Sequence, residues 1–324
     1  MVLLPGEAPG YARAVGAVKA GMLAARKVAA AGADALPVLE FADTTDDPAA
    51  IEQRYGEVVK SGAALVIGPL TRDAVTQIAV NAIATRRSLM LNQPDGVGSP
   101  SANGNLLFFG LALEQEAMQA QRVAAAEIAD GMRQNAVALA ANGAAYRRAA
   151  QAFARASAND PRLAVQVVET EDTARIRAAC KDAQIVFVAG DAGFIGTVRP
   201  YLPREASVLA TSHANPGDDA RINRLDLEGV EFVDMPWLLE PDHAAVMSYA
   251  RPDPEPGPRL SNDLQRLYAL GIDAWRVGVA WLDRDAFEID GVTGRLRVDS
   301  RRLTAVGREP VRARMRDGAP VLVR

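Results

Sequence analysis

Cysteine and histidine are scarce in this chain of 324 residues, and their scarcity excludes several kinds of site. The single cysteine, Cys180, cannot close an intramolecular disulfide, and two separated histidines, His213 and His243, cannot build a Cys/His metal cluster. No apolar run approaches the roughly 20 residues that a membrane-spanning helix needs. We therefore expect no disulfide scaffold, no metal, no cofactor and no transmembrane segment in this chain.

The net charge and the first residues of the chain bear on its partners and its location. The chain carries 36 Lys and Arg against 40 Asp and Glu, for a net charge of −4, whereas a domain that binds nucleic acid is usually basic. We expect no nucleic-acid partner. Met1 is followed by VLLP, without a basic segment or a cleavage site, so the chain is either cytoplasmic or a fragment from which an export signal has been removed.

The sequence contains none of the common catalytic motifs. The nearest approach to a GxGxxG motif, at residues 96–98, lacks the third glycine, and no P-loop, HExxH or GxSxG motif is present. His213 follows Ser212 and could act as a base, but the sequence identifies no carboxylate to orient it. We expect no enzymatic activity.

Short apolar runs alternate with longer stretches of helical period, which is the pattern of βαβ units and a parallel sheet. The pattern occurs twice, and it predicts an α/β fold of two doubly wound Rossmann-like lobes joined by a multi-strand hinge. The strands are expected over residues 2–4, 36–41, 64–68, 88–91 and 106–110, then 136–141, 163–168, 184–190 and 207–211. We expect lobe one over 1–110 plus 261–290, lobe two over 111–240 plus 291–324, and a Pro-rich loop over 241–260.

The last part of the chain follows a different pattern. Ser261 precedes the longest expected helix, and beyond it residues 294–300 and 309–318 alternate with period two, which predicts antiparallel strands of a final hairpin. Five arginines would share the solvent faces of these strands: Arg295, Arg297, Arg312, Arg314 and Arg316. They form either an ordinary solvated face or a docking patch for an acidic partner.

In open α/β sheets, ligands bind beyond the carboxyl ends of the strands. The candidate residues for a ligand cleft are those that follow the expected strands: Gly6, Tyr11, Pro69, Leu70, Thr71, Asn92, Gln93, Asp191, Ser212, His213 and Trp237. Helix amino termini at Thr71 and near Tyr11 could offer N–H groups to a carboxylate. Glycine and proline in these loops could equally be turn residues, and Trp237 could lie near the hinge, in a partner patch or in the core.

Several longer segments carry a family resemblance. The most specific are VLATSHANPGDDARINRLDLEGVEFVDMPWLL, LQRLYALGIDAWRV and GVTGRLRVD, and GAALVIGPLTRDAV and SLMLNQP add to them in lobe one. VIGPL alone is shared with amino-acid-binding proteins. Together the segments resemble the LppC family, outer-membrane lipoproteins that activate penicillin-binding proteins and that have a type I periplasmic binding protein fold.

The resemblance implies a non-enzymatic periplasmic regulator that binds a class A penicillin-binding protein, a bifunctional peptidoglycan synthase, and stimulates its transpeptidase activity. It also implies an outer-membrane lipid anchor in a full-length form. The alternative is a small-ligand receptor of the amino-acid transport type. There Asn92 takes the place of the usual hydroxyl, Thr71 could contribute, and Asp191 could pair with the ammonium of an amino acid. An enzyme acting on a nucleotide or sugar would need a nucleophile, base and oxyanion donor that the sequence does not assemble.

Overall fold

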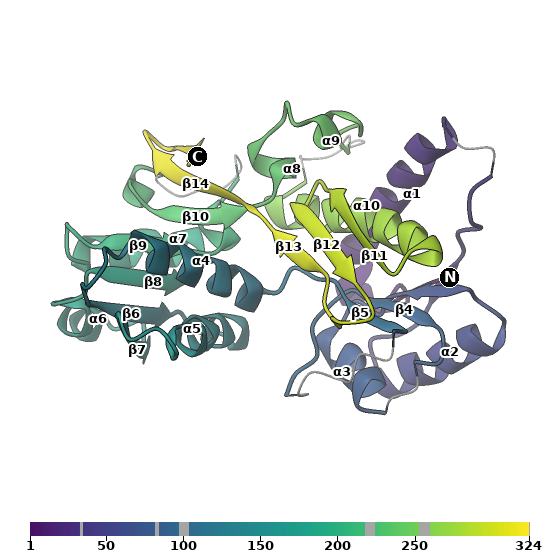
Figure 1. The fold of residues 1–324 in the computed structure, drawn as a ribbon, viewed down its shortest axis with the longest axis horizontal. Helices are drawn as coiled ribbons and strands as arrows, with labels where there is room; N and C mark the ends of the chain where they lie inside the picture. Colours follow the sequence, from purple (N-terminus) through teal and green to yellow (C-terminus); the bar gives the residue numbers. More distant parts are fainter. Residues whose placement is uncertain (33–34, 82–83, 97–103, 218–223, 253–259, 324) are drawn as a thin grey trace. The chain divides into compact units, whose positions relative to one another are not determined.

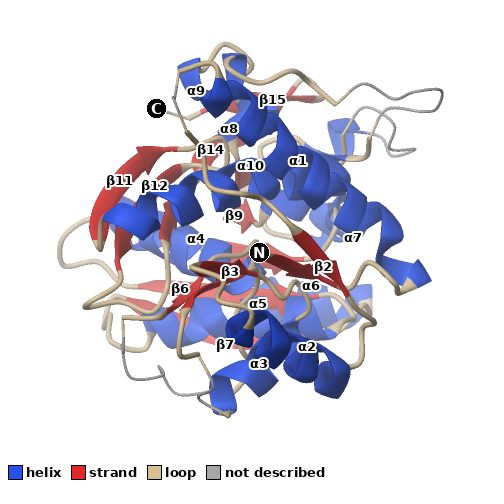
Figure 2. Ribbon diagram, turned by 90° about the vertical axis from the view of Figure 1, so that its right-hand side faces the viewer, coloured by secondary structure: helices blue, strands red, loops and turns tan. Residues whose placement is uncertain are grey.

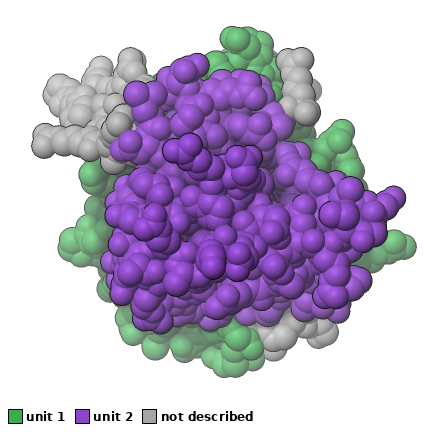
Figure 3. Space-filling model, turned by 90° about the vertical axis from the view of Figure 1, so that its left-hand side faces the viewer, with its two compact units in different colours: residues 1–111, 236–309 green, residues 112–235, 310–324 purple. Residues whose placement is uncertain are grey.

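The computed structural model describes residues 1–32, 35–81, 84–96, 104–217, 224–252 and 260–323, and the chain divides into two compact units (Figures 1 and 3). Unit 1 comprises Met1–Leu111 and Pro236–Glu309, and unit 2 comprises Ala112–Met235 and Pro310–Arg324. The chain therefore passes between the units after Leu111, after Met235 and after Glu309. None of the helices in the described part of the chain combines the length and apolar character that crossing a bilayer requires.

Unit 1 is built on a five-stranded parallel sheet with the order β2-β1-β3-β4-β5. Its strands are β1 (Val2–Leu4), β2 (Phe41–Asp43), β3 (Leu65–Ile67), β4 (Arg87–Met90) and β5 (Leu106–Phe108). Its principal helices are α1 (Ala12–Ala30), which follows η1 (Pro9–Tyr11), α2 (Pro48–Lys60), α3 (Arg72–Val80) and α10 (Asn262–Asp283). Side chains of α2 and α3 pack on one face of the sheet, and α1 and α10 pack against each other (Figure 2).

Local sequence explains where these helices begin. Asp47 accepts a hydrogen bond from the Ala50 N–H at 2.8 Å and is followed by Pro48, so α2 has both a capping side chain and a preset first turn. Ser261 caps α10 in the same way. Thr71 occupies the N-cap position of α3 as predicted, but its hydroxyl makes no capping hydrogen bond.

Unit 2 contains a seven-stranded sheet with the order β15-β14-β10-β9-β8-β6-β7. The strands are β6 (Gln134–Ala140), β7 (Leu163–Glu169), β8 (Ile185–Ala189), β9 (Ser207–Ala210), β10 (Glu231–Asp234), β14 (Val311–Arg316) and β15 (Ala319–Leu322). The helices are α4 (Leu113–Glu127), α5 (Ala144–Ser157), α6 (Thr173–Cys180) and α7 (Ala192–Val198), with turns η2 (Arg199–Tyr201), η3 (Ser212–Ala214) and η4 (Arg224–Leu227). β6 to β10 are parallel, and β14 and β15 add antiparallel strands at one side.

The parallel parts of the two sheets have the same topology. In each, the first strand lies between the second and the third, and the fourth and fifth follow outward, as in doubly wound folds. Stacked rings of Phe153 and Phe187, 4.7 Å apart, lie in the core that α4 and α5 form on one face of the unit 2 sheet. The predicted fold class, two doubly wound lobes of parallel βα units, is confirmed.

The predicted final hairpin is wrong. A second sheet of unit 1 has the order β11-β12-β13, with β11 at Ala286–Asp290, β12 at Arg295–Asp299 and β13 at Gly307–Glu309. β12 pairs with β11 and β13, whereas β14 pairs with β10 and β15 in unit 2. The two predicted strands fall on opposite sides of the crossing after Glu309, so they belong to different sheets.

The observed unit boundaries also differ from the expected ones. Residues 236–240 and 291–309, which the sequence analysis assigned to lobe two, belong to unit 1. Backbone hydrogen bonds explain this, because the Phe108 N–H donates to the Thr304 carbonyl at 2.7 Å and fixes the segment after β12 to β5. Residues expected as a Pro-rich loop contain the short helix α9 (Ala244–Met247), which follows α8 (Pro236–Leu239), and 253–259 lie outside the described residues.

One early strand is shifted from its expected position. The strand expected at 36–41 is found as β2 at Phe41–Asp43. Val38 is 75% exposed and lies in irregular chain, so the apolar run that suggested a strand is not part of the sheet.

Candidate functional site

Loops that follow β1, β3 and β4 lie at one edge of the unit 1 sheet, because these strands are parallel. They carry Gly6, then Pro69, Leu70 and Thr71, then Asn92 and Gln93. The Asn92 side chain donates from Nδ2 to the Leu70 carbonyl at 3.0 Å, and its Oδ1 accepts from the Gln93 N–H at 2.9 Å. Asn92 therefore holds two of these loops together.

Two polar side-chain atoms in the loops after β3 and β4 are buried without a partner among the described residues: the Thr71 hydroxyl and the Gln93 Nε2. A buried polar group left unpaired costs about 1–3 kcal/mol, so such atoms are candidates to bind a polar ligand. Tyr11 stands apart from them in η1, where it is 36% exposed. Gly6 serves close packing, since a Cβ there would overlap the carboxylate of Asp43.

The corresponding edge of unit 2 carries an interconnected polar cluster. The Tyr146 hydroxyl lies 3.1 Å from His213 Nδ1, and the two rings meet edge to face. The Ser212 N–H donates at 2.9 Å to Glu116, a carboxylate that is only 3% exposed. The Thr211 hydroxyl is fully buried without a partner among the described residues. The cluster joins α4, α5 and the segment after β9 through hydroxyl, imidazole and main-chain groups.

Two other predicted residues have structural roles. Asp191 follows β8 and caps α7, because its carboxylate accepts from the Phe194 N–H at 2.8 Å. Trp237 lies in α8 of unit 1 and is fully buried. Its ring is covered by the Arg251 guanidinium, 4.1 Å from the centroid, and packs on Tyr268. Burial removes Trp237 from any contact surface, so its assignment to a ligand cleft or partner patch is corrected to the core.

The expected arginine patch is divided between the units. Arg295 and Arg297 on β12 are exposed in unit 1 and lie near Glu288. In unit 2, Arg312 and Arg314 both bind Glu231, which is nearly fully buried.

Arg316 is exposed at the end of β14. Arg312 and Arg314 are therefore partners of a buried carboxylate, while 31% and 39% of their side chains stay exposed. The single docking patch expected over two paired strands does not exist in this form, because β12 and β14 are not paired.

The residues that complete the unit 2 cluster were not predicted from the sequence. Tyr146 and Glu116 come from helices α5 and α4, and each reaches the segment after β9 across the tertiary fold. Asn215 donates to the buried Asp234 at 3.0 Å and joins the ends of β9 and β10. No local motif connects these residues. Only Asn142-Gly143, ahead of α5, signals that a turn precedes Tyr146, and Gly143 has φ +132°.

Two doubly wound units of one topology, joined by repeated crossings of the chain, define a protein with a type I periplasmic binding protein-like fold. The chain belongs to the LppC family, whose model, described as "LppC putative lipoprotein", matches residues 1–176 and 161–318. The resemblance drawn from the sequence is thus confirmed.

Similar proteins include a "Penicillin-binding protein activator LpoA" from Shigella flexneri, which is 26% identical over 80% of this chain and 44% of the relative. This chain thus spans less than half the length of that relative. A "putative branched-chain amino acid ABC transporter" from Chromobacterium violaceum is 31% identical over 97% of this chain and 98% of its own, with a TM-score of 0.74. The C-domain of Haemophilus influenzae LpoA, "a regulator of PBP1A", is 20% identical over 99% and 98%, with a TM-score of 0.77.

Proposed function

We propose that this chain is a non-enzymatic regulatory domain that binds a class A penicillin-binding protein and activates it in peptidoglycan synthesis. The observation that carries the proposal is the family match over nearly the whole chain, together with relatives that are named penicillin-binding protein activators. The fold supports it, since the two-unit architecture is that of the LpoA C-domain. We further propose a periplasmic location, with an outer-membrane lipid anchor in a full-length form.

Activation by such a domain is a population shift. A regulator that binds the active conformation of the synthase more tightly than the inactive one raises the active fraction by its difference in affinity. A coupling of about 1–3 kcal/mol is typical and changes activity by roughly 5- to 150-fold. No catalytic group is required of the regulator for this effect.

The exposed arginines that remain available for docking are Arg295, Arg297 and Arg316. Arg295 and Arg297 are both 62% exposed in their side chains, so their guanidinium groups can exchange Glu288 for an acidic partner at small cost. Arg312 and Arg314 are omitted, because their replacement would leave Glu231 buried without its partners.

The amino-acid receptor is the less favoured function, since the curated relatives are named activators. The hydroxyls of Thr71 and Thr211, which have no partner in the described part of the chain, nevertheless give a reason to test a small ligand. A receptor gains thermal stability with its ligand. A thermal-shift screen of branched-chain amino acids and peptidoglycan fragments therefore accompanies the main experiment.

The main experiment is equilibrium binding of this chain to the periplasmic part of the source organism's class A penicillin-binding protein at two salt concentrations. We expect binding that raises transpeptidase turnover. We also expect the affinity to fall at high salt if the exposed arginines take part. The double variant Arg295→Glu/Arg297→Glu tests these two residues against wild type. Absence of binding at tens of micromolar, with a clear thermal shift by an amino acid, would contradict the proposal and favour a receptor.

A further inference from the structure

Strand β7 is one of the two edge strands of the unit 2 sheet, and within the described residues it pairs only with β6 (Figure 1). The Gln134 N–H donates to the Arg162 carbonyl, which fixes the alternation along the strand. Ala164, Gln166 and Val168 direct their N–H and C=O groups to β6. Val165 and Val167 therefore direct theirs away from the sheet. No hydrogen bond from these two backbone N–H groups is formed within the described residues.

β7 also lacks the features that protect the other edge strands of the described sheets. Proteins prevent an open edge from pairing with another chain by charged residues, proline, short strands or a covering segment. β2 and β13 have three residues each, β11 carries Glu288 and Asp290, β15 contains Pro320, and β5 is covered by the segment at Ala305. β7 runs for seven residues without proline, and its only charged residue is the last one, Glu169.

A groove lies beside this edge within unit 2. It has a volume of about 550 Å³ and lies over the starts of β6 and β7 and the end of α6. Small side chains contribute to its lining: Ala164 on the strand, and Ala178 and Ala179 at the end of the helix. Asp182 brings the only carboxylate of the lining. This carboxylate forms no ion pair among the described residues.

We propose that β7 accepts an extended segment of the partner protein as an added strand. Only an extended peptide backbone offers donors and acceptors at the two-residue spacing that Val165 and Val167 present. The groove selects the segment's side chains: alternate residues that are small and apolar, with a Lys or Arg placed to reach Asp182. This inference rests on the proposed function, for which it supplies a binding surface.

Replacing Val167 by proline tests the added strand. Val167→Pro removes one outward N–H and leaves the hydrogen bonds to β6 in place, and proline is tolerated on an edge strand whose N–H faces solvent. Val167→Thr is the matched control, because it keeps the N–H and the β-branched shape. With the periplasmic part of the class A penicillin-binding protein as the probe, we expect Val167→Pro to weaken binding about tenfold and Val167→Thr to change it less than twofold. Thermal unfolding of both variants shows that each is folded.

Amide hydrogen exchange tests the added strand a second time, without a variant. In the free chain, the amides of Val165 and Val167 should exchange much faster than those of Gln166 and Val168, which are bonded to β6. Addition of the partner should protect Val165 and Val167.

The outcomes separate the two proposals. If wild type binds and Val167→Pro binds equally well, the added strand is refuted and the proposed function stands. If wild type does not bind, the proposed function fails and the strand proposal falls with it. Protection of Val165 in the free chain, together with a concentration-dependent dimer that Val167→Pro abolishes, would overturn the proposal in favour of a second copy of this chain on the edge.

Discussion

Gly21 of α1 and Gly271 of α10 each face the backbone of the opposite helix in unit 1. A Cβ at Gly21 would overlap the Tyr268 carbonyl oxygen, and a Cβ at Gly271 would overlap the Val18 carbonyl oxygen. The two helices therefore approach to a distance that only glycine permits on either side.

Alanine at either position should destabilise unit 1. The added methyl group must push the helices apart, and overpacking of this kind costs about 1–3 kcal/mol, more than the gain in helix propensity. The measurement is urea unfolding of Gly21→Ala and Gly271→Ala. Gly16→Ala in the same helix α1 is the control, because a Cβ there meets nothing within 4 Å, and it should be neutral or stabilising by up to about 1 kcal/mol. Equal effects at Gly16 and Gly21 would refute the close approach.

Glu231 should be required for the stability of unit 2. Its carboxylate accepts from Arg312 Nε and Arg314 Nη2, both at 2.9 Å, and joins β10 to β14. Glu231→Gln should lower the free energy of unfolding by about 2 kcal/mol, because charge-assisted hydrogen bonds are lost at a buried site.

Charge reversal of Arg312 should be more damaging still, since it places a carboxylate against Glu231. Arg297→Glu, on an exposed strand face, is the matched reversal and should change stability by less than about 1 kcal/mol. Chemical denaturation of the three variants measures these differences. A tolerated Arg312→Glu would restore Arg312 as a candidate docking residue.

How far the sequence predicts this molecule depends on the range of the interactions. Apolar runs and capping residues such as Asp47 and Ser261 act within a few residues, so the βα units and their starts could be predicted. Strand pairing depends on contacts between residues that are far apart in the sequence. Residues 294–300 and 309–318 both alternate with period two, and alternation indicates a strand without naming its neighbour. The partners β11 and β10 became known only from the fold.

Prediction of the candidate site from the sequence is limited by long-range contacts in the same way. The loops after the strands could be named from the sequence, because parallel topology fixes which strand ends share an edge. The contact of Tyr146 with His213 could not, since it depends on how α5 packs beside η3. Trp237 could be named from the sequence, but its burial could not be predicted. An aromatic residue in a loop-like segment can be exposed or, as here, covered by another side chain such as Arg251.

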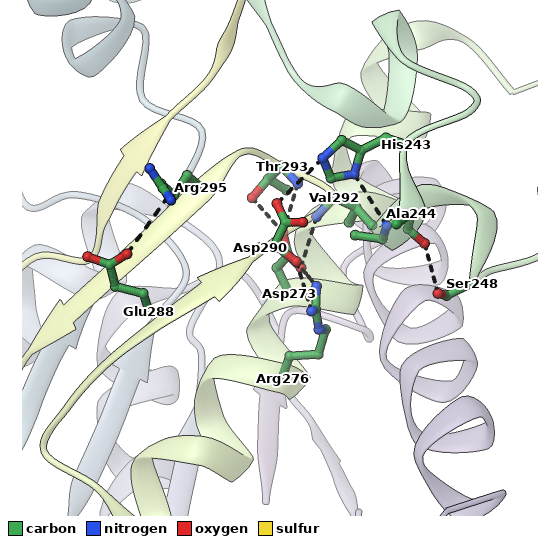
Figure 4. A network of polar contacts seen from close by, with 11 residues as sticks. His243, Ala244, Ser248, Asp273, Arg276, Glu288, Asp290, Val292, Thr293 and Arg295 are labelled. Atoms are coloured by element: carbon green, nitrogen blue, oxygen red, sulfur yellow. Dashed lines mark hydrogen bonds and ion pairs between the residues drawn. The ribbon is translucent and has the colours of Figure 1, made fainter.

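The turn between β11 and β12 is held by Asp273 of α10 (Figure 4). This fully buried carboxylate accepts from the Thr293 hydroxyl at 2.7 Å, the Thr293 N–H at 2.8 Å and the Val292 N–H at 3.2 Å, and it pairs with Arg276. Thr293→Val should cost about 1–2 kcal/mol, because it removes one donor at nearly constant shape.

Asp273→Asn should cost more than Thr293→Val, since the amide cannot accept from all these donors. Asp290→Asn is the control. Asp290 lies at the edge of the same network, but its side chain is 69% exposed and its ion pair with His243 is long at 3.5 Å. Thermal unfolding of the three variants ranks them. An Asp290→Asn variant less stable than Asp273→Asn would contradict the assignment of Asp273 as the anchor.

Cys180 should make stability depend on alkaline pH. Burial raises the pKa of its thiol from 9.0 to about 11, and the side chain is fully buried. The unfolded thiol loses its proton near pH 9 while the folded one keeps it, so stability is retained below pH 9 and falls between about pH 9 and 11, by up to roughly 3 kcal/mol.

Unfolding at several pH values, compared with Cys180→Ala, isolates this contribution from the tyrosines. A thiol reagent at pH 8 should label the folded chain slowly and the unfolded chain fully. Rapid labelling of the folded chain would show that the thiol is accessible.

The three crossings of the chain have a consequence for synthesis. The first 111 residues contain the whole parallel sheet of unit 1, but α10, which packs on α1, leaves the ribosome only after all of residues 112–235. The face of α1 that Gly21 occupies therefore stays uncovered while another unit is being made. During that interval a nascent chain carries exposed apolar surface, which is the condition under which chaperones bind. Production of this protein should accordingly be limited by what shields the first 111 residues until α10 has been synthesised.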